Sequence, residues 1–151
     1  MLPERNRLQV GYAVGDKTHM VDVAQESEGF RRYLAHLLAL YQTPRKQTLI
    51  FEHPESGIHP AALEALAEEF RTHVQDGRGQ VILTTHSPQF LDHFGPDQIR
   101  VVENDEGVTR IGPLAQEQVD AVREVMVRPG YLLTADPARI AEIDEPVAAR
   151  S

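Results

Sequence analysis

The chain contains no cysteine, which excludes a disulfide framework and a metal site built from thiolates. It also lacks any run of about 18 apolar residues, the length that a membrane-spanning helix requires. The amino-terminal segment MLPERNRLQV has no apolar core of the kind found in secretory signals. A net charge of -8, with no long block of one sign, disfavours nonspecific nucleic-acid binding through an overall basic field. We therefore expect a soluble, cytoplasmic protein with no membrane segment.

Apolar residues are plentiful enough to build a core. They make up 41% of the 151 residues, a proportion and a length that suit one globular domain. We assign residues 1–135 to this domain. A break at Pro129-Gly130 ends the last regular helix, and the proline-spaced, charged remainder predicts a weak helix or a loose tail, which we count as residues 136–151.

Hydrophobic periodicity predicts alternating strands and helices along the chain. Two strands, at residues 7–14 and 18–23, flank a hairpin turn at Gly15-Asp16. The helix that follows is capped by Ser27 and must end before Pro44. Beyond it we expect strands at residues 48–51, 80–85, 99–103 and 107–111, with the last two joined by a turn at 104–106, and helices that begin near Pro60, at Ser87-Pro88 and at residue 115.

Two of these helices have a clear apolar face. The helix that begins near Pro60 ends at Asp76-Gly77, where glycine suits a left-handed cap. The helix over residues 115–127 is the last regular one. The residues predicted to face inward are Leu63, Leu66, Ala67, Phe70 and Val74 in the first, and Val119, Val122 and Met126 in the second.

Two segments, TLIFEHPESGIHP at residues 48–60 and QVILTTHSP at residues 80–88, carry the most information. Each is an apolar, β-branched run that stops at ionisable residues, and a helix-patterned stretch lies between them. Parallel strands joined by one right-handed crossover have their carboxyl ends at the same edge of a sheet, which is where ligands bind in open α/β sheets. We therefore expect Glu52, His53, Glu55 and His86 to meet in one cleft.

The residues ESEGFR, at 26–31, lie at the start of a predicted helix. A serine hydroxyl, a glycine that permits close backbone approach and the free N–H groups of a helix N-terminus together form an anion site. Ser27 and Gly29 are therefore candidate phosphate-binding residues, although a serine before a helix is most often an ordinary cap.

Taken in order, ESEGFRRYLAHLLAL, TLIFEHPESGIHP and QVILTTHSPQFLD resemble the C-terminal half of an ABC-type ATPase of the AAA family, of the SMC- and OLD-like kind. In this resemblance residues 27–29 fall on the signature motif, 49–55 on the Walker B strand and its acidic end, and 56–60 on the D-loop. The resemblance implies an α/β fold, a partial P-loop NTPase domain with a mainly parallel sheet, flanking helices and antiparallel hairpins.

The resemblance also implies roles at the acidic strand end. Glu52 occupies the place of the residue that holds Mg²⁺, for which a carboxylate is a suitable hard ligand. His53 stands where the family usually has a glutamate that positions the attacking water, and an imidazole carries less negative charge than a carboxylate. Glu55 matches another acidic position of the motif. All three are candidate catalytic residues.

His86 falls on the switch histidine, which would sense or stabilise the γ-phosphate of ATP. Ser27 and Gly29 would contact the γ-phosphate of ATP held by an opposing subunit. The resemblance therefore implies ATP and Mg²⁺ as cofactors and a homo- or hetero-dimer partner that carries a Walker A motif. The parent class couples ATP-driven dimerisation to work on DNA or on a defence effector.

No G-x-x-x-x-G-K-[ST] phosphate loop occurs in the sequence. The nearest string, GYAVGDKT at residues 11–18, has one residue too few between its glycines and an extra residue before Lys17, and a strand-like run follows it. The chain is therefore a fragment, one piece of a split enzyme, or a degenerate relative. We expect the isolated chain to be inactive, and the alternative function is a non-catalytic, ATPase-like interaction module.

A competing interpretation is a transition-metal site. Imidazole and carboxylate groups are normal zinc ligands, and Glu52, His53, His59 and His86 supply enough donors. Adjacent residues of a strand point to opposite faces, however, which separates the side chains of Glu52 and His53 if both lie in the strand.

Overall fold

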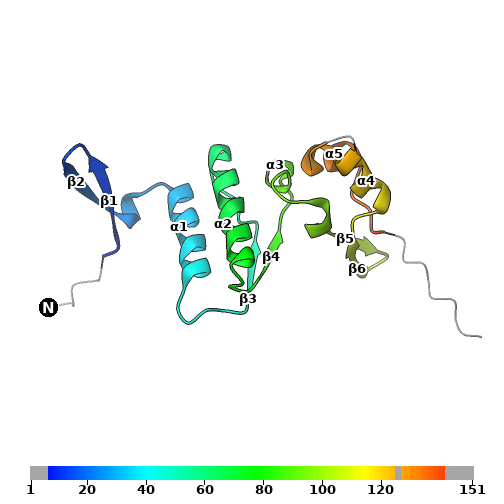
Figure 1. The fold of residues 1–151 in the computed structure, drawn as a ribbon, viewed down its shortest axis with the longest axis horizontal. Coiled ribbons are helices and arrows are strands. Elements are labelled where there is room, and N and C mark those ends of the chain that lie inside the picture. The colour runs from blue at the N-terminus through cyan, green and yellow to red at the C-terminus, as the bar shows by residue number, and fades with distance from the viewer. Residues whose placement is uncertain (1–6, 125–126, 142–151) are drawn as a thin grey trace, which may run out of the picture. The chain divides into compact units, whose positions relative to one another are not determined.

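The computed structural model describes residues 7–124 and 127–141 (Figure 1). Contacts within the chain divide it into two units, residues 1–85 and residues 86–151. In the described part of both units, no helix is long and apolar enough to cross a membrane. The assignment of residues 1–135 to one ATPase-like domain stays a prediction.

The first unit begins with an antiparallel hairpin, as predicted. Strands β1 (Gln9–Val14) and β2 (Lys17–Asp22) pair from Gln9 opposite Asp22 to Val14 opposite Lys17. Gly15 in the connecting turn has φ +58°, a conformation that glycine adopts without a steric penalty. The near-match to a phosphate loop thus lies in a strand, a turn and a strand, rather than in a loop that leads into a helix.

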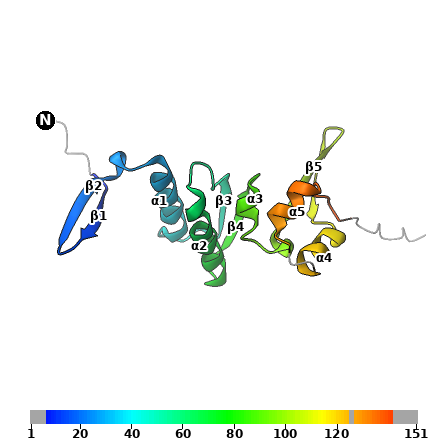
Figure 2. The same cartoon turned by 90° about the horizontal axis from the view of Figure 1, so that it is seen from above.

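A short 3₁₀ turn, η1 (Val23–Gln25), leads to α1 (Glu28–Tyr41). The Ser27 hydroxyl accepts a hydrogen bond from the backbone N–H of Phe30 at 3.2 Å, which confirms the predicted cap. The second helix, α2 (Leu63–Gln75), follows the 3₁₀ turn η2 (Pro60–Ala62) and lies beside α1 (Figures 1 and 2). Gly77, with φ +64°, ends α2 in the left-handed conformation that was expected.

The inward face of α2 was predicted correctly except at its end. Leu63, Leu66, Ala67 and Phe70 are buried, but Val74 is 48% exposed, and His73 is buried instead. The reason is local packing, because the last turn of α2 lies against Leu40 near the end of α1, on the side of His73. Helical periodicity alone does not show which flank of an apolar face a neighbouring helix covers.

Strands β3 (Thr48–Glu52) and β4 (Gln80–Thr84) are parallel and form a two-stranded sheet, with α2 in the connection between them. The register places Thr48 opposite Gln80 and Glu52 opposite Thr84. On the covered face, the ring centroid of Phe51 lies 5.0 Å from that of Phe70 in α2 and 5.4 Å from that of His36 in α1. This aromatic cluster ties both helices to the sheet.

The second unit begins with the short helix α3 (Pro88–Leu91), which is capped by Ser87 as predicted, and the turn η3 (Pro96–Gln98). Strands β5 (Arg100–Asp105) and β6 (Val108–Pro113) form an antiparallel hairpin. Its turn is Glu106-Gly107, with φ +49° and +88°, and not residues 104–106. A two-residue turn has positive φ at both positions, which favours glycine, so Gly107 and not the preceding polar residues fixes where the turn lies.

Helix α4 (Gln116–Glu124) agrees with the prediction over the described residues, while Met126 lies outside them. The helix ends before Pro129-Gly130, as expected, but it is not the last one, because Pro129 is the first residue of another helix, α5 (Pro129–Ala135). Proline is favoured at this position, since its missing N–H would have no partner inside the helix. One hydrophobic cluster of this unit is formed by Val101, Leu114 and Val119, with Leu133, Ala138 and Ile140 packed against them.

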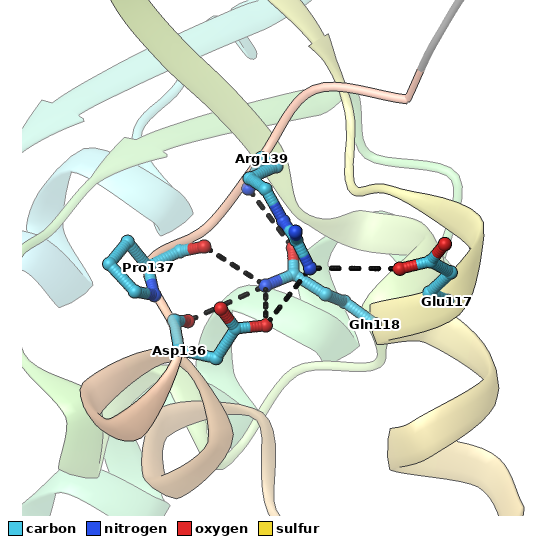
Figure 3. Close-up of polar contacts among 5 residues, drawn as sticks. All are labelled: Glu117, Gln118, Asp136, Pro137 and Arg139. Atoms are coloured by element: carbon cyan, nitrogen blue, oxygen red, sulfur yellow. Dashed lines mark hydrogen bonds and ion pairs between the residues drawn. The ribbon is translucent and has the colours of Figure 1, made fainter.

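The described part of the expected tail is held by one buried side chain (Figure 3). The Gln118 amide donates to Asp136 Oδ2 at 2.9 Å and to the Pro137 carbonyl at 3.0 Å, and its oxygen accepts from the Arg139 N–H at 3.0 Å. A bridge between Leu114 and Ile140 continues this attachment. Residues 142–151 lie outside the described part of the chain.

The fold class is therefore mixed α/β, with antiparallel hairpins near both ends, as expected. The expectation of a mainly parallel sheet is not met in the described residues, where two of the three sheets are antiparallel and the parallel one has two strands. A partial domain explains the difference, since strands that would extend β3–β4 are absent from the described residues.

Candidate functional site

The carboxyl ends of β3 and β4 lie side by side. Glu52, the last residue of β3, is opposite Thr84, the last residue of β4, and the backbone N–H of the next residue, His53, donates to the Thr84 carbonyl at 3.0 Å. The predicted meeting of two co-directional strand ends is thus confirmed for the backbone. This edge of the sheet is where a ligand of an α/β protein is expected.

His53 turns the chain away from the strand. Its φ of +46° is left-handed, which costs a residue with a Cβ about 1–2 kcal/mol. The turn breaks the strand's alternation, so the argument that Glu52 and His53 must point to opposite faces does not hold here. The imidazole Nδ1 of His53 lies 3.5 Å from Glu55 Oε1. Strained backbone of this kind is common at functional sites.

Glu55 is the most buried carboxylate of this group, with 11% of its side chain exposed. Its Oε1 accepts a hydrogen bond from the Thr85 hydroxyl at 2.6 Å. Its Oε2 is buried and has no hydrogen-bond partner among the described residues. A buried carboxylate oxygen is costly to leave without a donor, so Oε2 of Glu55 needs a donor from outside the described residues, of which water is the simplest.

The oxygen donors at this edge fit magnesium better than zinc. Glu52 is exposed and Glu55 offers a second carboxylate, and Mg²⁺ is usually held by one or two carboxylates together with waters and substrate phosphates. The described residues contain no group of three or more His, Asp or Glu side chains placed to hold a metal ion. Within the first unit, Glu52, His53 and His59 of the alternative transition-metal site are therefore not grouped to hold a metal ion.

The other two histidines of the transition-metal interpretation are His59 and His86, and they lie in different parts of the chain. His59 caps η2, its Nδ1 accepting a hydrogen bond from the Ala61 N–H at 3.2 Å, so it has a structural role. His86 is the first residue of the second unit and comes two residues after Thr84 in the chain. Its assignment as a switch histidine stays a prediction.

A second group of candidate residues surrounds the start of α1. A Cβ atom added to Gly29 would lie 2.7 Å from the Gly57 carbonyl oxygen, so only glycine allows this close approach. An open pocket of about 500 Å³ lies at this contact. It is lined by Ser27, Gly29, Phe30, Tyr33, Gly57, Ile58, His59, Ala62 and Ala65. The structure therefore brings the predicted signature and D-loop segments together.

Two residues of the site were given no role from the sequence. Thr85 donates to Glu55, and the His36 ring Nε2 lies 3.0 Å from the Pro54 carbonyl oxygen. Burial lowers the pKa of His36, while the contact with Pro54 acts in the opposite direction. The only sequence signal for Thr85 was its position next to His86. No local pattern points to His36, because the loop that it contacts is 18 residues away.

Comparison with known proteins agrees with this arrangement. Residues 2–92 match the family described as "AAA domain, putative AbiEii toxin, Type IV TA system". A curated protein of Helicobacter pylori named "ATP/GTP phosphatase" is 26% identical over 87 residues, which cover 56% of this chain and 23% of that protein. The chain thus spans about a quarter of the length of this relative.

The fold has also been seen in a solved structure. A chain from work described as "Structural biochemistry of ATP-driven dimerization and DNA stimulated activation of SMC ATPases" has a TM-score of 0.56 and 17% sequence identity. The similarity covers 78% of this chain and 71% of that one. At this level of identity the likeness shows the fold alone.

Proposed function

The chain belongs to this AAA-domain family, and from that premise we propose that it supplies the signature, Walker B, D-loop and switch-histidine part of an ABC-type ATPase site. The observation that carries the proposal is the parallel pair β3–β4, whose strand ends place Glu52 beside Thr84 and lead on to Glu55 and Thr85. A triphosphate site needs acidic residues at such an edge to hold the metal that accompanies the phosphates.

In this proposal Glu52 serves Mg²⁺, which neutralises charge on the phosphates when it is bound. His53 and Glu55 orient the water that attacks the γ-phosphate. Their contact at 3.5 Å supports a joint role, because the carboxylate supplies the negative charge that an imidazole lacks. His86 contacts the γ-phosphate from the segment after β4. The remaining catalytic effect is positioning and charge stabilisation, which is most of what phosphoryl transfer requires.

In the same proposal, Ser27 and Gly29 contact the γ-phosphate of ATP that an opposing subunit binds. The start of α1 offers a capped N-terminus, which favours negative charge, and Gly29 keeps that terminus free of a Cβ atom. The partner carries the Walker A loop, and ATP-dependent association with it acts on DNA or on a defence effector. We also propose that the protein works in the cytoplasm, as expected from the sequence.

A titration with MgATP tests the proposal. The isolated chain should bind MgATP weakly or not at all and hydrolyse none, because it lacks a phosphate loop. Tight binding that Lys17→Ala abolishes would show that residues 11–18 hold phosphate after all. When a partner that supplies a Walker A loop restores hydrolysis, Ser27→Arg should block it, while His19→Gln on the exposed strand β2 should leave it unchanged. Hydrolysis that survives Ser27→Arg would remove the trans-site assignment.

A second candidate function is a non-catalytic interaction module. The presence of His53 in place of a glutamate, together with the missing phosphate loop, favours it. The substitution His53→Glu separates the two candidates. In a reconstituted enzyme it should raise turnover if position 53 orients the water, whereas no hydrolysis with either residue, at intact partner binding, supports the module.

A further inference from the structure

The short helix α3 directly follows the segment that carries His86. Only Ser87 separates His86 from Pro88, the first residue of α3. A helix of four residues has too few internal hydrogen bonds to keep its shape alone, so its neighbours decide where it lies. The element that α3 contacts most is α5, and the two helices lie side by side within the second unit (Figures 1 and 2).

Gly130 of α5 lies directly on the backbone of Pro88. Both Pro129 and Gly130 are buried. A Cβ atom added to Gly130 would overlap the carbonyl oxygen and carbon of Pro88 and would lie 2.7 Å from its Cα atom. Only glycine therefore fits where α5 meets the first residue of α3. Because backbone atoms cannot move aside as the end of a side chain can, this contact fixes the separation of the two helices.

A hydrogen bond joins the same two helices. The Gly130 N–H donates to Asp92 Oδ1 at 2.9 Å, and the Asp92 N–H donates to the Pro88 carbonyl at 3.0 Å. The first N–H groups of a helix have no partner inside it, and Arg128, the residue before α5, supplies no side-chain cap. Asp92 therefore caps α5 from the end of α3, and a carboxylate is a stronger acceptor than a neutral group.

The helix that makes these contacts lies outside the region matched by the family. That match ends at residue 92, whereas α5 consists of Pro129–Ala135. A later part of the chain thus holds the element that comes directly after the proposed switch histidine.

We propose that α5 positions His86 for its contact with the γ-phosphate, with Asp92 and Gly130 as positioning residues that act through α3 and not on the nucleotide. Proline fixes its own φ and restricts the residue before it, so a held Pro88 also limits Ser87 and the direction of the backbone at His86. This inference rests on the proposed function, because the role of His86 is taken from it.

Steady-state kinetics test the role in catalysis, in the assembly that hydrolyses MgATP, whichever polypeptide supplies its Walker A loop. Asp92→Ala should lower kcat about tenfold and change KM less than about twofold, because His86 acts mainly in the transition state. Asp92→Asn keeps an oxygen acceptor and should recover most of kcat. Asp97→Ala is the matched control, which removes an ion pair with Arg123 elsewhere in the same unit and should change kcat less than about twofold.

A double-mutant cycle separates positioning from a general loss of structure. In a His86→Ala background, Asp92→Ala should have little further effect on kcat, because the group that Asp92 positions is already absent. Thermal unfolding first checks that each variant is folded at the assay temperature. Equal fold-losses in the two backgrounds would overturn the proposal, and so would an unchanged kcat in Asp92→Ala.

Amide hydrogen exchange of the isolated full chain tests the contact without any nucleotide. Asp92→Ala and Gly130→Ala should each raise deuterium uptake in peptides that contain residues 86–92, while peptides from β5 and β6 keep the uptake of the unchanged chain. Asp97→Ala should leave the uptake of residues 86–92 as it is. Unchanged uptake of residues 86–92 in Asp92→Ala would show that α5 does not hold this segment.

The two proposals fail in different ways. If hydrolysis depends on Ser27 and His86 but not on Asp92, the proposed function stands and the positioning role is wrong. If Asp92→Ala loosens residues 86–92 but no assembly hydrolyses MgATP, the hold of α5 on this segment stands, and the ATPase assignment falls together with the role in catalysis.

Discussion

At the scale of single residues, the site depends on polar groups that the fold buries. The hydrogen bond from Thr85 to Glu55 is the clearest case, because it joins residues that are 30 positions apart and fixes the carboxylate at the strand ends. Glu55 Oε1 also lies 3.5 Å from His53 Nδ1, and the left-handed backbone of His53 is strained for a residue with a Cβ atom. Strained backbone clusters at functional sites, and a buried charge needs a partner, so both features agree with the proposed site.

Removing the Thr85 hydroxyl should destabilise the first unit. Thr85→Val keeps the shape of the side chain but takes away the donor to Glu55, and the loss of a hydrogen bond to a charged group costs about 2 kcal/mol. Urea unfolding at pH 7 measures this change in the free energy of unfolding. Thr85→Ser is the matched control, which retains the donor and should lose less than about 1 kcal/mol. A loss in Thr85→Ser as large as that in Thr85→Val would contradict the prediction that the hydrogen bond is the larger contribution, because serine retains the donor.

His73 makes stability depend on pH. It is 3% exposed, and neither of its ring nitrogens makes a hydrogen bond of normal geometry to a described residue. Burial is the main cause that lowers the pKa of His73 below its usual 6.5, and the positive charges of Arg78 and Arg45 act in the same direction. The Leu40 carbonyl and Asp76 act in the opposite direction, each more weakly than burial. The folded protein therefore favours the neutral imidazole.

The sign of the pH effect follows from this lowered pKa. Above pH 6.5 the imidazole is neutral in both states, and its full contribution to stability is present. As the pH falls below that value, the unfolded state takes up the proton first, so the free energy of unfolding decreases until the folded state also binds it. His73→Leu should flatten this decrease in urea titrations between pH 7 and pH 5, leaving the part due to His36, whose pKa is also lowered. An unchanged slope in His73→Leu would refute the assignment, and His19→Gln is the exposed control.

At the scale of elements, local signals were sufficient where one residue decides the geometry. The Ser27 cap, the left-handed Gly77 and the turn at Gly15 each follow from neighbouring residues, and the apolar runs gave β3 and β4 with their common direction. Long-range pairs could not be predicted in this way. The contact between Gly29 and Gly57, the pairing of Thr85 with Glu55 and the burial of His73 all depend on which element lies opposite, and no local pattern records that.

The contact between α1 and the loop after β3 requires a glycine at position 29. Gly29→Ala would place a Cβ atom 2.7 Å from the Gly57 carbonyl oxygen, so the helix start or the loop must move. Overpacking of this kind costs about 1–3 kcal/mol. Gly95→Ala is the control, since its added Cβ would meet only the Gln98 side chain at 3.7 Å. A crystal structure or amide exchange of Gly29→Ala should show the change confined to the start of α1 and the loop. A loss of stability no larger than that of Gly95→Ala would mean that the contact is loose.

At the scale of the whole molecule, the described residues form three sheets of two strands each, and each strand has an unpaired edge within them. Exposed apolar residues lie on all of these sheets, among them Met20, Ile50 and Ile111. Two-stranded sheets with bare apolar surface gain little stability from their own packing. Much of the stability of this chain should therefore come from what covers these faces, which links its folding to its proposed partner.

Thermal unfolding tests this link between stability and assembly. Saturating MgATP alone should leave the melting temperature of the isolated chain unchanged, because a ligand that does not bind the folded state cannot stabilise it. A partner present at about 100 times its Kd should add about 2.7 kcal/mol, and for a unit of this size that corresponds to a rise of roughly 10 °C or more. MgATP should raise the melting temperature further only in the complex. A rise with MgATP alone would mean that the chain contains a complete nucleotide site, and the argument from the missing phosphate loop would then fail.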